Sequence, residues 1–397
     1  MINPSASGWI DKFFARLNYR LPTGFTPQEL YLSVRDSGFI YGHVISFIDL
    51  DKAETKGWTT EEVTKAALLD TLYDMYRLEA GRGDKDKFIA RCIAFYREMT
   101  PEEYSLFKRV LPATTPSHEL EEILDVRIRN NENIISRNFS HILTNALLFI
   151  DVLAFRQFLA SGHIPDKYMK KLEGTVMGTV SMALNTKKQK TAYDDLLMKL
   201  FESSVRYTKI TKDGKIAEAV ELDSFESPLE KNYLLDMAGM AIWTDGMADS
   251  SEIDFLYELA SRLGIDDATA AESIASYDVF IKLHKKDIPY FKYSNPVKHF
   301  YEHTAQNVSL LISRNKNRFI KELTNNGELM LLLTHSTHRT LNPKEKKKIK
   351  KQLLEICKTV PSLTIFLLPG GSLLLPLLIK FIPQMLPSVF NENLDNE

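Results

Sequence analysis

The sequence has few of the residues that stabilise small secreted domains or fibrous chains. It contains only 2 cysteines, Cys92 and Cys357, among 397 residues. This number excludes a disulfide framework and a four-thiolate zinc site, and it fits a reducing compartment. With 17 glycines and 16 prolines the chain is neither collagen-like nor dominated by linkers. Hydrophobic residues make up 44% of the chain, which is enough for buried cores and excludes wholesale disorder.

Motifs of common catalytic chemistry are also missing. The sequence has no G-x-x-x-x-G-K-[ST], no G-x-G-x-x-G and no G-x-S-x-G, so nucleotide-binding and α/β-hydrolase chemistry have no support. An H-x-x-E-H pattern occurs at residues 299–303. Helical spacing places its polar side chains opposite the apolar face of the same segment, and no third metal ligand is evident. We therefore expect a protein that is not an enzyme and that uses no cofactor.

The formal net charge is small because acidic and basic regions cancel. The chain carries 50 Lys+Arg against 52 Asp+Glu, a net charge of -2. Residues 311–351 hold 11 basic and 3 acidic side chains, a local excess of 8 positive charges, whereas residues 1–310 hold 37 basic and 45 acidic ones. This segregation predicts an anionic partner for the basic stretch, either nucleic acid or a membrane surface.

Long uncharged runs are scarce, and only one of them is a candidate for membrane insertion. The N-terminus lacks a charged segment followed by an apolar run, so we expect no secretory signal. The apolar run 142–159 contains Asp151 and Arg156, which favours a buried helix of a folded core. Residues 363–379 carry no charge and reach the lower length limit for a membrane-spanning helix. Prolines interrupt this run, so the alternative is a broken apolar hairpin packed inside a helical core.

Helical periodicity dominates the rest of the chain. Starts with a capping residue followed by acids predict helices from Thr59 to about Leu78 and from Thr100, and a further helix follows Pro165. Two β-favouring arms around Asp213-Gly214 predict a hairpin. The expected fold class is all-α, multi-helical, with one β-hairpin and a C-terminal apolar helical segment broken by prolines. The expected domains are an N-terminal helical domain at 1–164, a second helical region at 165–300 and a C-terminal region at 301–397.

The lysine cluster of the basic stretch lies on a predicted amphipathic helix. Asn342 suits the N-cap and Pro343 the first helical position, and apolar residues recur at helical spacing as far as Val360. Such a helix would lie at a membrane surface before the apolar segment, or would pack its apolar face on a domain. On the first interpretation, the side chains that contact anionic lipid headgroups are Lys344, Lys346, Lys347, Lys348, Lys350 and Lys351.

A second pattern lies between residues 232 and 264. An apolar helix leads to a turn at Asp245-Gly246, and a new helix starts at Asp249 with Glu252 three residues on. Asp249 and Glu252 together are typical of a capping box. The apolar helix, the Asp-Gly turn and the acid-started helix resemble the TerB-like family, helical domains linked with tellurite-resistance proteins. This resemblance implies a metal site at Asp245, Asp249 and Glu252, although capping by itself accounts for the last two.

The end of the chain resembles the membrane segment of the LETM family, transmembrane proteins of mitochondria with bacterial relatives. The resemblance covers about 340–390 and rests on the basic helix, the Val-Pro at 360–361, three prolines spaced seven apart, and the closing FIPQMLPSVF. With the TerB-like middle, it looks like the bacterial LETM-related proteins described as biofilm-associated. The resemblance places these residues in the membrane segment: Pro369, Gly370, Gly371, Ser372, Pro376, Lys380, Pro383 and Pro387.

Two departures limit what this resemblance implies. The mitochondrial proteins are tied to cation/proton exchange and carry a glutamate where this chain has Ser372, and a serine hydroxyl does not relay a proton as a carboxylate does. They also continue into a long domain associated with ribosome binding, whereas this sequence stops at Glu397. Both departures argue against ion exchange and ribosome binding by the family's route.

These observations predict a non-enzymatic, LETM-related protein on the cytoplasmic face of the inner membrane, anchored or peripheral through its C-terminus. It would contact lipid headgroups and unidentified protein partners, with a homo-oligomer as an option, in envelope or biofilm physiology. Nucleic acid is not expected, because the lysines adjoin an apolar run rather than interleaved aromatics. The alternatives are a soluble helical scaffold with a TerB-like module and a component of cation/proton transport, which would need oligomerisation.

Overall fold

The computed structural model describes residues 2–17, 24–47, 50, 55–81, 83–99, 115–129, 145–186, 222–242, 248–284, 286, 316–339 and 342–359. Within these residues the regular structure is entirely helical, with thirteen α-helices and one 3-10 helix. The all-α prediction is therefore confirmed. The hairpin predicted around Asp213-Gly214 and the apolar segment 361–390 lie outside the described residues.

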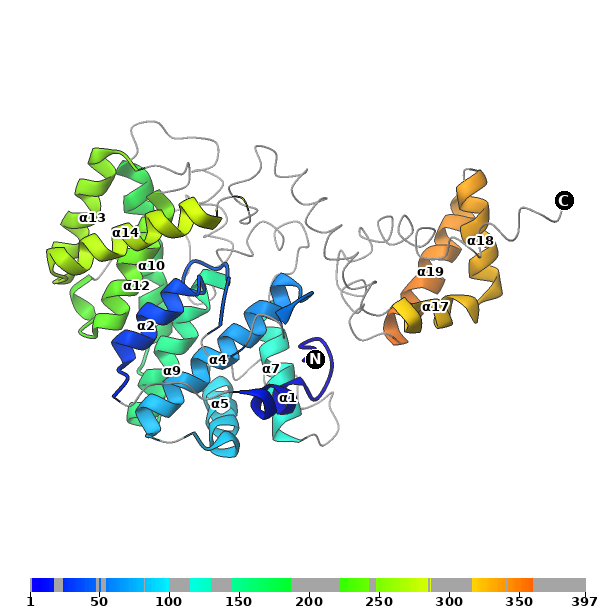
Figure 1. Cartoon of the computed structure of the whole chain (residues 1–397), viewed down its shortest axis with the longest axis horizontal. Coiled ribbons are helices and arrows are strands. Elements are labelled where there is room, and N and C mark those ends of the chain that lie inside the picture. Colours follow the sequence, from blue (N-terminus) through cyan, green and yellow to red (C-terminus); the bar gives the residue numbers. More distant parts are fainter. Residues whose placement is uncertain are drawn as a thin grey trace. The chain divides into compact units, whose positions relative to one another are not determined.

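The chain divides into two compact units (Figure 1). The N-terminal unit comprises Met1–Lys56, Thr60–Asn130 and Phe139–Ser294, and the C-terminal unit comprises Gly57–Thr59, Asn131–Asn138 and Asn295–Glu397. The boundaries at 164 and 300 stay a prediction. The helices of the N-terminal unit are α1 (Trp9–Arg16), α2 (Pro27–Asp36), α4 (Thr60–Ala80), α5 (Lys85–Met99), α7 (Pro116–Arg129), α9 (Phe149–Ser161), α10 (Tyr168–Thr186), η1 (Leu222–Ser224), α12 (Pro228–Ile242), α13 (Ser250–Leu263) and α14 (Asp267–His284).

Local capping chemistry sets several helix ends in the N-terminal unit. Helix α2 starts with a capping box in which the Thr26 side chain accepts from the Glu29 backbone N–H, and Pro27 occupies its first position. Helices α4 and α10 begin within three residues of the predicted positions. Helix α9 ends at Gly162, whose φ of 82° is the left-handed conformation that glycine adopts without strain. The start predicted at Thr100 lies outside the described part of the chain.

The core of the N-terminal unit forms where α4 packs against α9 and where α10 packs against α12 (Figure 1). Aromatic rings fill the region between α4, α5 and α9. Phe88 contacts Tyr73 and Phe155 edge-on, with ring centroids 5.0 and 6.4 Å apart, and Phe95 contacts Phe155 at 5.2 Å. Edge-to-face contacts of this kind add to the free energy gained by burying the rings.

Helix α9 is the buried helix that the sequence predicts for the apolar run 142–159. Its Asp151 is fully buried and accepts hydrogen bonds from Arg127 of α7, Nε to Oδ2 at 2.6 Å and Nη2 to Oδ1 at 2.5 Å. The hydroxyl of Tyr96 on α5 donates to the same carboxylate at 3.2 Å. The charge inside the apolar run is therefore part of a protein core. Among the described residues, no helix combines the length and the apolar character that crossing a membrane requires.

A second buried carboxylate joins α2, α12 and α14. Asp236 of α12 accepts from the Tyr31 hydroxyl and, at 2.5 Å, from the Ser273 hydroxyl. Burial raises the pKa of Asp236 above its usual value. Beside this group, Arg35 donates to Glu272 at 2.8 Å. These polar contacts fix α2 against helices more than 200 residues further along the chain.

The C-terminal unit contains three described helices, α17 (Lys316–Thr324), α18 (Gly327–His338) and α19 (Pro343–Thr359), each of which contacts the other two. Helix α18 is capped by Asn326, whose side chain accepts from the Leu329 backbone N–H at 3.1 Å. Phe319 and Leu323 of α17 are fully buried, as are Leu329 and Leu333 of α18. The three helices therefore enclose a small apolar core.

Candidate functional site

The basic helix α19 starts where the sequence predicts and is firmly held at that end. Asn342 and Glu345 form reciprocal bonds, each backbone N–H donating to the other side chain at 2.9 Å, and Pro343 is the first helical residue. Arg339 also donates to both carboxylate oxygens of Glu345, at 2.9 and 2.6 Å. The hydrogen bonds from Arg339, followed by that from the Asn342 backbone, lower the pKa of Glu345 to about 2.

The apolar face of α19 is buried inside the C-terminal unit. Ile349, Leu353, Ile356 and Cys357 are at most 6% exposed. They share a face at helical spacing, and α17 and α18 are the described helices that α19 contacts. Of the two interpretations of this amphipathic helix, the structure therefore supports packing on a domain. The same side chains are not available to enter lipid while the unit stays folded.

The lysine cluster covers exposed surface of α19. All six predicted headgroup-binding side chains are exposed: Lys344, Lys346, Lys347, Lys348, Lys350 and Lys351. Lys348 pairs with Glu328 of α18. Within the described residues the other five have no carboxylate within the 4.0 Å of an ion pair. At 100° per residue, Lys344, Lys347 and Lys351 fall in one arc of about 60° away from the buried face.

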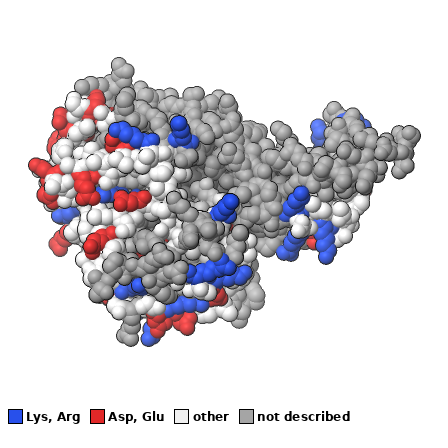
Figure 2. Space-filling view, in the orientation of Figure 1, with Lys and Arg blue, Asp and Glu red and all other residues white. Residues whose placement is uncertain are grey.

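Charge is separated between the two units at the level of the surface. Helices α17, α18 and α19 carry ten Lys or Arg and four Glu. Figure 2 shows basic side chains over these helices, and it shows acidic ones gathered where α13 and α14 of the N-terminal unit lie. Those two helices carry six Asp or Glu and two Lys or Arg. The segregation seen in the sequence thus persists on the folded surface.

The acidic turn that resembles TerB-like proteins is partly described. Asp249 caps α13, because its Oδ1 accepts from the Glu252 N–H at 2.9 Å and Glu252 Oε2 accepts from the Asp249 N–H at 2.7 Å. The capping interpretation of both residues is therefore confirmed. Asp245 lies outside the described residues, within which no three metal-ligating side chains converge. A metal site at Asp245, Asp249 and Glu252 stays a prediction.

The residues assigned to the membrane segment, from Pro369 to Pro387, all lie beyond Thr359, the last residue that the structure describes. The H-x-x-E-H pattern at 299–303 is likewise outside the described ranges. The assignment of a membrane segment and the interpretation of the H-x-x-E-H residues as solvent-facing are therefore still predictions.

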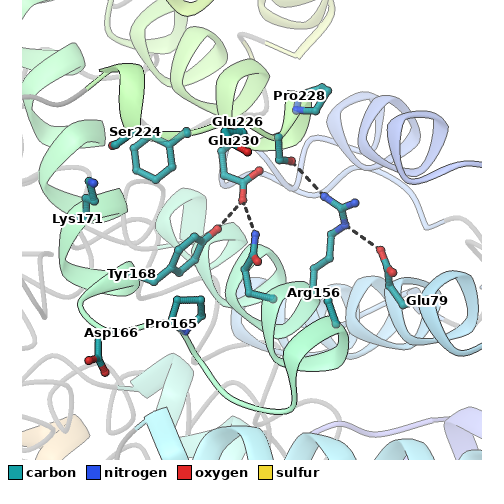
Figure 3. Close-up of a pocket in the computed structure, with 14 residues that line it drawn as sticks. Glu79, Arg156, Pro165, Asp166, Tyr168, Lys171, Ser224, Glu226, Pro228 and Glu230 are labelled. Atoms are coloured by element: carbon teal, nitrogen blue, oxygen red, sulfur yellow. Dashed lines mark hydrogen bonds and ion pairs between the residues drawn. The ribbon is translucent and has the colours of Figure 1, made fainter.

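A pocket in the N-terminal unit is a second candidate site, which sequence reasoning missed (Figure 3). Its volume is about 640 Å³, and side chains from α4, α9, α10, α12 and the segment after η1 line it. Glu230, only 2% exposed, is one of the lining residues. One signal was available, since Ser227-Pro-Leu-Glu230 has the S-x-x-E spacing of a capping box. In the structure, however, Glu230 Oε1 accepts from the Tyr168 hydroxyl at 2.7 Å and from Gln157 Nε2 at 3.2 Å.

Comparison with protein families gives a match that includes the basic helix. Residues 341–397 match the protein-family model described as LETM1-like, RBD. The C-terminal part of the chain, which begins just before α19, is thus similar to LETM1-like proteins, and this supports the LETM-related part of the prediction. The assignment of residues 361–390 to a membrane segment stays a prediction. No curated protein matches the chain, and no solved structure does. The TerB-like middle and the biofilm-associated type remain predictions from resemblance.

Proposed function

We propose that this LETM-related protein associates with an anionic membrane surface through the exposed lysines of α19. The observation that carries the proposal is a set of five exposed lysines without an acidic partner among the described residues. Three of them, Lys344, Lys347 and Lys351, lie opposite an apolar face that is already buried. Lysines close to an anionic bilayer each contribute about 1 kcal/mol of binding free energy. Because the apolar face is not available, the attraction through α19 is electrostatic and therefore sensitive to salt.

The segment after α19 would add a second, apolar contribution. Residues 363–379 carry no charge, and they follow directly on the helix that bears the lysines. A basic cluster beside an apolar segment is the arrangement that orients and strengthens membrane attachment. We propose that α19 meets the headgroups of the cytoplasmic leaflet while 361–390 enters the bilayer. Partner proteins and a role in envelope or biofilm physiology follow from the resemblance alone.

Vesicle binding tests the contribution of α19. The full-length protein is mixed with vesicles of neutral lipid alone, or with about one third anionic lipid, and the bound fraction is measured by flotation over a range of salt. The triple variant Lys344→Gln, Lys347→Gln, Lys351→Gln should bind anionic vesicles roughly a hundredfold more weakly, because three contributions of about 1 kcal/mol are lost. The matched control Lys12→Gln, Lys56→Gln, Lys286→Gln removes the same charge from other exposed positions and should bind as the parent does.

Equal binding by both triple variants would refute the role of α19. Extraction with alkaline carbonate separates the second contribution: attachment through 361–390 resists the wash, and attachment through lysines alone does not. Stronger binding of the parent protein to RNA than to anionic vesicles would show that the anionic partner is a nucleic acid. The transport alternative concerns residues beyond Thr359, and the test for it is cation-dependent pH change in proteoliposomes.

A further inference from the structure

Beside the pocket of the N-terminal unit lies a buried carboxylate oxygen that has no partner among the described residues. Glu230 is 2% exposed, and its Oε1 already accepts from Tyr168 and Gln157. Its Oε2 is buried and has no hydrogen-bond partner among the described residues, so a ligand in the pocket meets this oxygen only after the side chain turns toward it. Leaving a buried acceptor unsatisfied costs free energy, so the arrangement is stable only if something compensates for it. A ligand that donates a hydrogen bond to Oε2 would do so.

The lining of the pocket favours a cation as that ligand. Four carboxylates line it, from Glu79, Asp166, Glu226 and Glu230, against the two cationic side chains of Arg156 and Lys171. Arg156 is neutralised by Glu79, with 2.8 Å between Nε and Oε1, and it also donates to the Ser227 hydroxyl at 3.1 Å. Figure 3 shows Glu230 between Tyr168 and Arg156, with its carboxylate among the other lining side chains.

The donor set distinguishes an organic cation from a metal ion. Calcium and magnesium require six or more oxygen ligands at short range, whereas one N–H group requires a single acceptor. Two protein donors, Tyr168 and Gln157, already occupy Oε1, which leaves one oxygen of Glu230 for a ligand. Phe225, 5% exposed, adds a buried aromatic ring to the lining. One vacant acceptor, aromatic lining and surplus negative charge together suit an alkylammonium group.

We propose that this pocket binds a small aliphatic diamine, one ammonium of which donates to Glu230 Oε2. A volume of about 640 Å³ lies within the range of small-molecule sites. The second ammonium is attracted by the exposed carboxylates of Asp166 and Glu226, which line the same pocket. The inference is independent of membrane binding by α19, since the two sites lie in different units.

Calorimetric titration of the full-length protein with butane-1,4-diamine tests the proposal, with butane-1,4-diol as the uncharged analogue of the same shape. We expect saturable binding of the diamine and none of the diol. Glu230→Gln keeps the shape of the side chain and removes its charge, and it should weaken diamine binding at least about tenfold. The matched control Glu258→Gln, at an exposed position of α13 away from the pocket lining, should leave it unchanged.

The exposed lining residues provide a test that does not depend on a core substitution. Asp166→Asn with Glu226→Gln should weaken diamine binding several-fold while the melting temperature of the protein stays the same, because both side chains are exposed. If Glu230→Gln does not fold, the double variant and the comparison with the diol still test whether the pocket binds the diamine. No diamine binding by the parent, equal binding of the diol, or unchanged affinity in the double variant would each overturn the proposal.

Discussion

Removing the carboxylate of Asp151 should destabilise the N-terminal unit more than any single surface substitution. This carboxylate has no exposed area and meets the guanidinium of Arg127, itself 5% exposed, through two hydrogen bonds of 2.5 and 2.6 Å. In Asp151→Ala the guanidinium stays buried and loses the carboxylate. Breaking a buried pair from one side costs about 3–5 kcal/mol, which is a large part of the roughly 5–15 kcal/mol that stabilises a typical domain.

A double replacement separates this cost from the net contribution of the pair. Arg127→Met combined with Asp151→Leu removes both charges and keeps apolar volume, so most of the lost stability should return. The matched control is Arg97, 43% exposed, which pairs with Glu119 at 2.7 Å between α5 and α7. Because exposed pairs contribute about 0–1 kcal/mol, Arg97→Met should have little effect.

Urea unfolding followed by tryptophan fluorescence gives the measurement. Trp9 of α1 is 2% exposed, and α1 packs on α7, the helix that carries Arg127. The midpoint of the transition is compared among variants at constant m-value, since a change in m would indicate that the two units do not unfold in one step. A loss below about 1 kcal/mol in Asp151→Ala, equal to that in Arg97→Met, would refute the buried pair.

Two further predictions concern helix ends and backbone conformation. Asp249→Ala should cost about 1 kcal/mol in thermal unfolding, because it removes the N-cap of α13, and Asp249→Ser should recover most of the loss; an unchanged melting temperature in Asp249→Ala would contradict the cap. Gly38 has a φ of 82°, and a Cβ there would lie 2.0 Å from the His43 backbone oxygen, so Gly38→Ala should cost more than about 2 kcal/mol. Gly239→Ala, at a helical position where a Cβ meets nothing within 4 Å, should leave the free energy of unfolding unchanged or raise it. Similar losses of stability in both glycine variants would contradict the left-handed backbone at Gly38.

The sequence determines the features of this protein that depend on neighbouring residues. The starts of α13 and α19 follow from Asp249 and Asn342, because each capping side chain bonds to a backbone N–H three residues away. Helix α4 begins at Thr60, within the predicted start Thr59-Thr60. Exposure of Lys344, Lys347 and Lys351 follows from their spacing against Ile349 and Leu353. The sequence of residues 341–397 by itself suffices to match this part of the chain to LETM1-like proteins.

Only the tertiary structure decided which partners distant residues have. The sequence indicated that Asp151 belongs in a core, but its partner Arg127 comes from another helix. From the sequence pattern alone, the apolar face of α19 could contact either lipid or protein. In the structure α19 contacts α17 and α18, and its apolar face is buried. Glu230 Oε1 accepts from Tyr168 and Gln157, which lie more than 60 residues earlier in the chain, whereas Oε2 has no partner in the part of the chain that the structure describes. Periodicity and capping depend on residues close together in the sequence, so they can be read from the sequence of one helix. Burial and pairing depend on which other helix packs against that helix, which only the tertiary structure decides.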